Sequence, residues 1–194
     1  MQSIMISIKP KYVAQILNGE KTIEIRKTMP KCLYPIDVYI YCTKGKPLIY
    51  CSDKNWHWHI KETKNFQYDM RFNYYAGFNG KVVAKFTLNK VEELYIKHCV
   101  GWNTNTIKDV LTIEEKTCVS RFALFDYLGS KGGYAWHISN LEIFDRPKEL
   151  SEFDRCILTE DLSHDNITHI HQRFKITKAP QSWCYVEVKN DEIH

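Results

Sequence analysis

Short runs in which apolar and polar side chains alternate recur along the chain, and this period of two is typical of half-buried β-strands. The runs that predict strands cover 4–8, 22–26, 37–43, 48–51, 82–88, 134–143 and 183–188. The segment 44–47 contains Gly45 and Pro47 and has the composition of a turn. We therefore expect strand 48–51 to pair back on strand 37–43.

Two stretches have the period of a helix instead. Pro10 suits the first turn of one helix, and Asn18 with Gly19 provides its left-handed stop. Thr112 and Glu115 have the spacing of a capping box, which opens a second helix that we expect to reach about residue 128. The apolar stripe expected to face the core from this second helix is Cys118, Phe122 and Phe125, with Leu128 as a further member.

The composition fits one globular domain, because the chain has 194 residues of which 44% are apolar and 13% aromatic. Alternating strands with few helices predict an α+β fold, in the form of a small mixed or antiparallel β-barrel with helices packed at its rim. Less patterned stretches at 52–79 and 148–178 predict two excursions within the single domain 1–194. The formal net charge of +4 permits a phosphate-bearing partner without requiring one.

The sequence also bears on the compartment. No segment approaches the roughly 20 apolar residues that a membrane-spanning helix needs, and the N-terminus lacks a signal-peptide pattern. The seven cysteines are scattered and odd in number, which is typical of reduced thiols rather than of a disulfide framework. We therefore expect a cytoplasmic protein without a membrane partner.

The strand at 22–26 carries a concentration of charge. Alternation places Glu24 and Arg26 on the face opposite the two isoleucines, about 7 Å apart at their Cβ atoms. Lys21 stands at the start of the same strand. An ammonium, a carboxylate and a guanidinium in this arrangement can grip a polar ligand by charge-assisted hydrogen bonds. The alternative is an ordinary ion pair on a solvent-facing strand.

The pattern Gly-x-Lys-x-x-Glu-x-Arg after a short helix resembles the motif of the ASCH family in the PUA-like superfamily. It is filled here by Gly19, Lys21, Glu24 and Arg26. Later segments are similar to that family in the same order, namely 80–86, 134–138 and 179–186. The resemblance covers almost the whole chain. It implies a PUA-like fold with a cleft between the barrel and the first helix, where RNA or a nucleobase-like ligand binds.

A base in such a cleft needs hydrogen bonds on its edge and stacking on its face. The residues expected to bind the ligand are Lys9, Lys21, Glu24, Arg26, Tyr41, Trp136 and Trp183. The carboxylate and guanidinium would meet the edge, the aromatic rings would stack, and the two lysines would meet a phosphate. The first hypothesis is therefore a module that binds single-stranded RNA or a modified nucleoside or nucleotide.

The second hypothesis is a small hydrolase. Some ASCH proteins that this chain resembles hydrolyse the acetyl amide of N4-acetylcytidine with a lysine, a threonine and a distal glutamate. Lys21 matches that lysine, whereas Glu24 stands in the threonine's place and would instead act as general base on water. Lys21 or Arg26 would stabilise the oxyanion. A further alternative is a ribonuclease, in which His137 and Lys21 act in acid–base catalysis.

A third hypothesis is a protein-interaction module, which leads if Glu24 and Arg26 form a closed ion pair with no cavity beside it. The segment 52–79 is either a nucleic-acid platform of aromatic and basic side chains or a loop that packs on the barrel. His57 and His59 lie one residue apart, and three further histidines follow Cys156 at 164, 169 and 171. Neither group has a complete ligand set, so we expect no metal and no cofactor.

Overall fold

The computed structural model of the chain describes residues 2–52, 57–63, 73–97, 101–160 and 168–189. Its strands are β1 (Ser3–Ile8), β2 (Ile23–Arg26), β3 (Ile36–Cys42), β4 (Leu48–Ser52), β5 (Trp58–Glu62), β6 (Asn73–Tyr75), β7 (Val82–Lys97), β8 (Gly101–Asn103), β9 (Gly133–Lys148), β10 (Phe153–Glu160), β11 (Thr168–Lys175) and β12 (Trp183–Val188). Its helices are α1 (Pro10–Leu17), α2 (Val110–Thr117) and α3 (Arg121–Leu128), with 3₁₀ turns η1 (Gly129–Lys131) and η2 (Leu150–Glu152).

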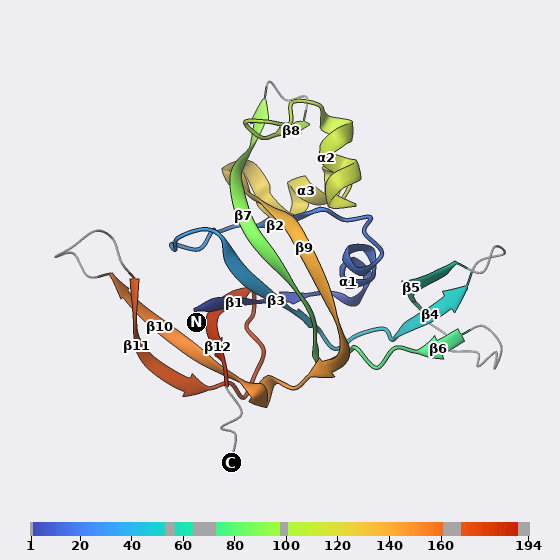
Figure 1. Cartoon of the computed structure of the whole chain (residues 1–194). Helices are drawn as coiled ribbons and strands as arrows, with labels where there is room; N and C mark the ends of the chain where they lie inside the picture. The colour runs from blue at the N-terminus through green and yellow to red at the C-terminus, as the bar shows by residue number, and fades with distance from the viewer. Residues whose placement is uncertain (1, 53–56, 64–72, 98–100, 161–167, 190–194) are drawn as a thin grey trace, which may run out of the picture.

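Most of the strands join one mixed sheet in the order β11-β10-β12-β1-β3-β7-β9-β2, with β8 paired to β7. β1 and β3 run parallel, whereas the other neighbours are antiparallel. The predicted α+β class with a mixed sheet is confirmed. The closed form of the predicted barrel is not, because β2 and β11 end the sheet on opposite sides and do not pair within the described ranges (Figure 1).

The reason lies in how the sheet grows at its ends. Much of the expected excursion 148–178 forms the hairpin β10–β11, which adds to β12 and carries the sheet outward instead of back toward β2. At the other end, β7 and β9, each 16 residues long, pair from Val82 to Leu94 of β7 with three register shifts. Such bulges bend and twist a strand pair. The bent pair carries β2 and the helices α2 and α3 (Figure 1).

The predicted pairing of strand 48–51 with strand 37–43 is wrong. β4 pairs with β5 and β6 in a separate three-stranded sheet. The physical reason is that β3 has no free edge: β1 occupies one side of it and β7 the other. A strand that follows β3 must therefore find other partners, and two strands of the expected excursion 52–79 supply them.

The predicted single helix from Thr112 to about residue 128 is two helices, α2 and α3. Cys118 adopts a left-handed conformation, with φ 52°, and ends α2. The N-cap of α2 is Asp109 rather than Thr112, because its carboxylate accepts from two backbone N–H groups of the first turn. The break also changes which side chains face inward: Phe122 is 75% exposed and Phe125 38% exposed, so the predicted core stripe is wrong at these two positions, whereas Leu128 is buried in the core.

The core lies in three clusters, and β2 separates two of them. Ile23 and Ile25 of β2 pack with α2, α3 and the buried Trp102. The larger cluster fills the space between α1 and the strands β1, β3 and β7. Charged side chains of β2 therefore enter a region that is enclosed on several sides by packed elements. No helix within the described ranges has the length and apolar character that crossing a membrane requires.

Candidate functional site

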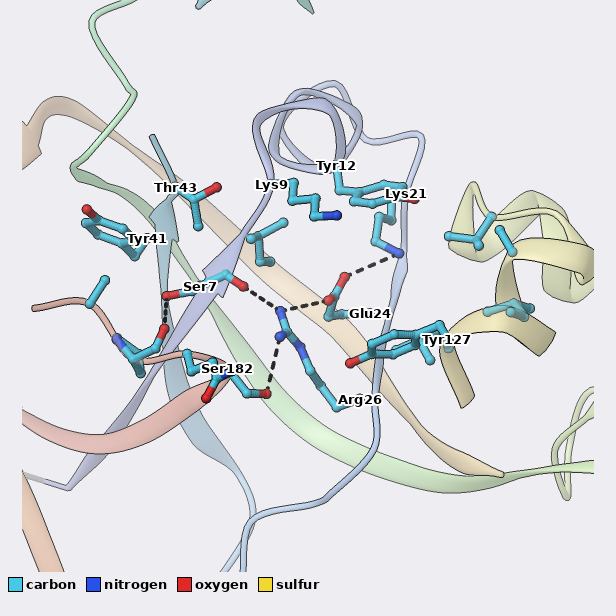
Figure 2. Close-up of a pocket in the computed structure, with 18 of the residues that line it drawn as sticks. Ser7, Lys9, Tyr12, Lys21, Glu24, Arg26, Tyr41, Thr43, Tyr127 and Ser182 are labelled. Atoms are coloured by element: carbon cyan, nitrogen blue, oxygen red, sulfur yellow. Dashed lines mark hydrogen bonds and ion pairs between the residues drawn. The ribbon is translucent and has the colours of Figure 1, made fainter. Parts of the chain in front are cut away.

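A cavity of about 820 Å³ opens beside β2, and we call it the main cavity (Figure 2). It is bounded by the end of β1, the first turn of α1, the end of β3, the helix α3 and the segment 179–182. Its charged lining residues are Lys9, Lys21, Glu24, Arg26 and Asp126, and its aromatic ones are Tyr12, Tyr41 and Tyr127. The cavity thus combines fixed charges with flat rings from distant parts of the chain.

Lys21, Glu24 and Arg26 form a buried group that we call the motif ion cluster. Glu24 Oε1 lies 2.9 Å from Arg26 Nη2, and Glu24 Oε2 lies 3.3 Å from Lys21 Nζ. The three side chains are at most 9% exposed. Strand alternation sets Glu24 and Arg26 on the same side of β2, which is why one short strand can build the pair. With two cations and one anion, the cluster carries a net positive charge.

All three protons of the Lys21 ammonium have a partner within the protein. Besides Glu24, Lys21 Nζ donates to the carbonyl oxygen of Ile23 at 2.8 Å and to that of Thr117 at 2.7 Å. The ring of Tyr12 covers the ammonium at 5.5 Å from its centroid. Because an ammonium has only three donors, Lys21 fixes the position of Glu24 and of α2 rather than presenting a free donor to the cavity.

Arg26 joins three segments of the chain. Its Nη2 donates to the carbonyl oxygen of Ser7 at 2.8 Å as well as to Glu24, and its Nη1 donates to Ser182 Oγ at 3.4 Å. A guanidinium has five N–H donors, and these contacts use three of them. The Nε donor is buried without a partner among the described residues. Arg26 therefore has the directional donors that planar acceptors require, in a place already organised by the protein.

Tyrosine rings from three elements line the main cavity. Burial raises the pKa of Tyr12, and the nearby Glu24 carboxylate raises it further. Burial also raises the pKa of Tyr127, with an opposing effect from Arg26 and a smaller raising effect from Glu24. Burial is again the main cause of the raised pKa of Tyr41. All three phenols are therefore neutral at physiological pH and present flat apolar faces to a ligand.

The structure brings together most of the residues that the sequence marks as candidate ligand contacts. Lys9, Lys21, Glu24, Arg26 and Tyr41 all line the main cavity, and Figure 2 shows their side chains around the same space. Lys9 is solvent-exposed at the start of α1, in contrast to the buried Lys21. These positions agree with a site built on the motif strand.

The two tryptophans do not line the main cavity. Trp136 lies opposite Glu24 in the β2–β9 pair, but its side chain is fully buried in the large core cluster. Its ring packs against that of Trp183, with centroids 5.9 Å apart. The Trp183 indole N–H donates to Thr28 Oγ1 at 3.0 Å. Both rings therefore stabilise the fold beside the site, and a ligand in the main cavity could not stack on Trp136.

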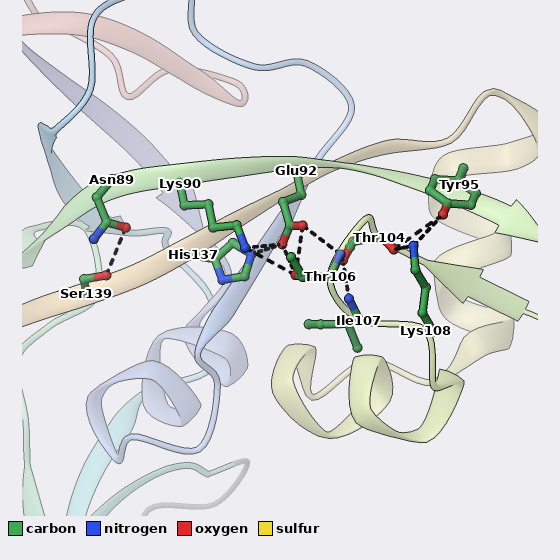
Figure 3. A network of polar contacts seen from close by, with 10 residues as sticks. All are labelled: Asn89, Lys90, Glu92, Tyr95, Thr104, Thr106, Ile107, Lys108, His137 and Ser139. Atoms are coloured by element: carbon green, nitrogen blue, oxygen red, sulfur yellow. Dashed lines mark hydrogen bonds and ion pairs between the residues drawn. The ribbon is translucent and has the colours of Figure 1, made fainter.

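His137 also lies outside the main cavity, in the polar network of Figure 3. Its Nε2 is 2.7 Å from Glu92 Oε2, and Glu92 further accepts from Thr106 and pairs with Lys90. Burial opposes ionisation of Glu92, but these hydrogen bonds outweigh it and lower its pKa to about 2. Burial lowers the pKa of His137, and the Glu92 contact offsets part of that effect. Glu92 therefore fastens the loop around Thr106 to β7, and His137 links this contact to β9.

Several residues of the site carry no signal in the sequence that reveals their role. Tyr127 lies about 100 positions from the motif and reaches the cavity only because Lys21 and β2 hold the α2–α3 segment in place. Ser182 is placed at the cavity by two tertiary contacts: its hydroxyl accepts from Arg26, and its carbonyl oxygen accepts from the backbone N–H of Ser7. Tyr12 is recognisable as part of the first helix but not as a lining residue.

The histidine-containing segments do not form a metal cluster in the part of the chain that the structure describes. His59 Nε2 lies 3.0 Å from Cys51 Sγ on neighbouring strands. No group of three or more His, Cys, Asp or Glu side chains is placed to hold a metal ion within the described ranges. His164 and the basic and aromatic positions at 64–72 lie outside the described ranges, and the side chains of His169 and His171 are not described.

Comparison with known proteins adds a structural likeness to this description. No family model matches the chain, and no curated protein matches it. A crystal structure of a mutant of the protein ZmASCH from Zymomonas mobilis is similar over 95% of this chain and 90% of that chain. The sequence identity is 15% and the TM-score 0.48. At this level of similarity the likeness assigns no function to the chain.

Proposed function

We propose that this protein is a nucleoside-binding module, which holds one base of single-stranded RNA or a free modified nucleoside in the main cavity. The observation that carries the proposal is the motif ion cluster of Lys21, Glu24 and Arg26 beside three neutral tyrosine rings in one cavity. A volume of about 820 Å³ falls in the range of small-molecule sites and leaves room for a base with its sugar.

The edge of a base would meet Glu24 and Arg26. Each Glu24 oxygen has one protein partner and can accept a further hydrogen bond from an amino or imino group of the ligand. Arg26 Nη1 has a second N–H for a ring nitrogen or carbonyl oxygen, close to the Ser182 hydroxyl. Donors and acceptors side by side are what distinguishes one base edge from another. Lys21 takes part by holding Glu24 in this geometry.

The face of the base and its phosphate would meet other parts of the cavity. Tyr12 and Tyr127 offer rings that border the motif ion cluster, and stacking on such rings tolerates any base. Lys9 is the exposed cation of the lining. It suits a phosphate better than Lys21, whose three N–H donors already have partners in the protein. Positive charge at the cavity favours ligands with an anionic group.

A hydrolase is the second candidate, favoured by the buried carboxylate of Glu24 between two cations. In that role Glu24 would activate water, and an oxyanion would have to bind Arg26, because every donor of Lys21 is already used. His137 lies outside the cavity and cannot share the reaction. The constellation therefore supports binding over turnover. A cavity adjoins the Glu24–Arg26 pair, so the condition that favoured a pure protein-interaction module is not met.

The proposal is tested by titrating fluorescent single-stranded RNA into the protein at two salt concentrations, with anisotropy as readout. The same samples are then run on a denaturing gel. We expect saturable binding that weakens with salt, with the RNA left intact. Cleaved RNA that depends on Glu24 would favour the hydrolase. Absence of binding to RNA and to a panel of free nucleosides would refute the proposal.

A further inference from the structure

A second cavity of about 290 Å³ lies at the end of β2, where the strand leaves the motif ion cluster. Lys27 and Lys131 line it together with Glu93, and Gly132 with Gly133 form part of its wall. Two ammonium groups against one carboxylate leave a net positive charge there. Neither lysine forms an ion pair with a carboxylate among the described residues. The second cavity is therefore a candidate for an anionic group.

One aromatic ring of the main cavity contacts a lysine of the second cavity. Lys27 directly follows Arg26 in the chain, and its Nζ lies 5.1 Å from the centroid of the Tyr127 ring. Tyr127 lines the main cavity and the Lys27 ammonium lies over its ring, so a ligand that contacts this ring in the main cavity lies close to Lys27. One ligand could therefore place its base in the main cavity and its anionic group in the second cavity.

The glycines keep the wall of the second cavity bare. A Cβ atom at Gly132 would lie 2.5 Å from the carbonyl oxygen of Leu94, and the φ of Gly132 is +73°. A Cβ atom at Gly133 would lie 2.7 Å from the carbonyl oxygen of Arg26. Both distances are too short for any side chain, so only glycine fits at either position. As a result, this part of the cavity wall is backbone rather than side chain.

We propose that the second cavity, rather than Lys9 of the main cavity, binds a phosphate group of the ligand whose base occupies the main cavity. This inference rests on the proposed function and makes it more specific, because it requires a phosphorylated ligand. Lysine ammonium groups bind phosphate oxygens by charge-assisted hydrogen bonds, and two of them can share one phosphate. The group is the phosphate of a nucleotide or the phosphodiester of an RNA strand, and these two sources share the same chemistry.

The test compares a nucleoside with its 5′-monophosphate, its 3′-monophosphate and a trinucleotide, each titrated calorimetrically into the full chain. We expect at least one phosphorylated form to bind about tenfold more tightly than the nucleoside. A gain for the monophosphates indicates a nucleotide, and a gain confined to the trinucleotide indicates an RNA strand. Both would support the phosphate site if the gain disappears in Lys27→Gln with Lys131→Gln.

The controls separate this inference from the proposed function. The Lys27→Gln, Lys131→Gln variant should bind the unphosphorylated nucleoside as the wild type does, which also reports that it is folded. Lys175→Gln, an exposed lysine on β11, should keep the full gain. Nucleoside binding without any gain from phosphate, or a gain that survives in the double variant, would overturn the phosphate site and leave the proposed function standing. Failure of the nucleoside itself to bind would overturn both.

Discussion

The Lys21 ammonium donates to the carbonyl oxygen of Thr117 at 2.7 Å, across 96 positions of the chain. The same ammonium holds the carboxylate of Glu24, and the backbone of the neighbouring Thr22 donates to the carbonyl oxygen of Lys116. These contacts fasten the end of α2 to β2, and α3 then closes one side of the main cavity. The motif lysine thus organises the site at the level of structure, before any ligand is present.

Lys21→Met should therefore destabilise the protein strongly. The substitution leaves one oxygen of Glu24 and two carbonyl oxygens buried without the lysine donor, and removing one partner of a buried ion pair costs roughly 3–5 kcal/mol. Urea unfolding at neutral pH measures the change in the free energy of unfolding. Lys46→Met is the matched control, because it breaks an exposed pair with Glu62 and should cost less than about 1 kcal/mol. Equal effects of the two substitutions would contradict this role of Lys21.

Tyr127→Ala and Tyr127→Phe should separate stacking from hydrogen bonding in the main cavity. Loss of the ring should weaken binding of a base by roughly 1–3 kcal/mol, whereas loss of the hydroxyl alone should leave it nearly unchanged. Titration of the same nucleoside into both variants gives the two affinities. Unchanged affinity in Tyr127→Ala would exclude this ring as a stacking surface.

Glu92 should make stability depend on pH in the acid range. Its pKa is lowered from 4.5 to about 2 in the folded state, so it contributes stability above pH 4.5 that is lost as the pH falls toward 2. The lowered pKa of His137 acts in the same direction below pH 6.5. Glu92→Gln should cost about 2 kcal/mol at pH 7, measured by urea unfolding. The difference from wild type should shrink as the pH approaches 2.

Glu92→Gln also tests whether the polar network of Glu92 and His137 takes part in ligand binding. Glu92 and His137 lie outside the main cavity, so Glu92→Gln should leave nucleoside affinity unchanged at neutral pH. A stability difference that stays constant from pH 7 to pH 2 would contradict the assignment of the low pKa. A loss of nucleoside affinity without loss of folded protein would mean that the network belongs to the site after all.

Phe122→Gln and Leu124→Ala test the break between α2 and α3. Phe122 is largely exposed, so its replacement should change stability by less than about 0.5 kcal/mol. Leu124 is buried in the cluster with Trp102, and its truncation should cost roughly 2–5 kcal/mol. Thermal and urea unfolding measure both. A single continuous helix with Phe122 in the core would reverse the order of the two effects.

The alternation of apolar and polar residues is sufficient to predict strands whose position depends only on the local sequence. The alternation at Ile4, Ile6 and Ile8 predicts β1, and the final strand was predicted at the residues that form β12. Pairing was not predictable in the same way. The partner of β4 depends on both edges of β3 being occupied, and one of those edges is filled by β7, which comes later in the chain.

The same limit holds for the site. Lys21, Glu24 and Arg26 lie on one strand, so their proximity follows from alternation alone. Tyr127 reaches the cavity through tertiary contacts that no local pattern contains. For Trp136 the register was informative, since it lies opposite Glu24, but burial against Trp183 removes it from the cavity.

The proposed binding of a nucleoside by Arg26 is tested most directly by a calorimetric titration of a nucleoside panel into the wild type, Arg26→Ala and Arg173→Ala. Arg173 is a matched control, because it lies on β11 at the far end of the sheet order and pairs with Glu187 of β12. We expect the wild type and Arg173→Ala to bind the same nucleoside with equal affinity. Arg26→Ala, checked to be folded by circular dichroism, should bind it at least about tenfold more weakly. Equal affinity of all three proteins, or no binding by any of them, would contradict the central claim.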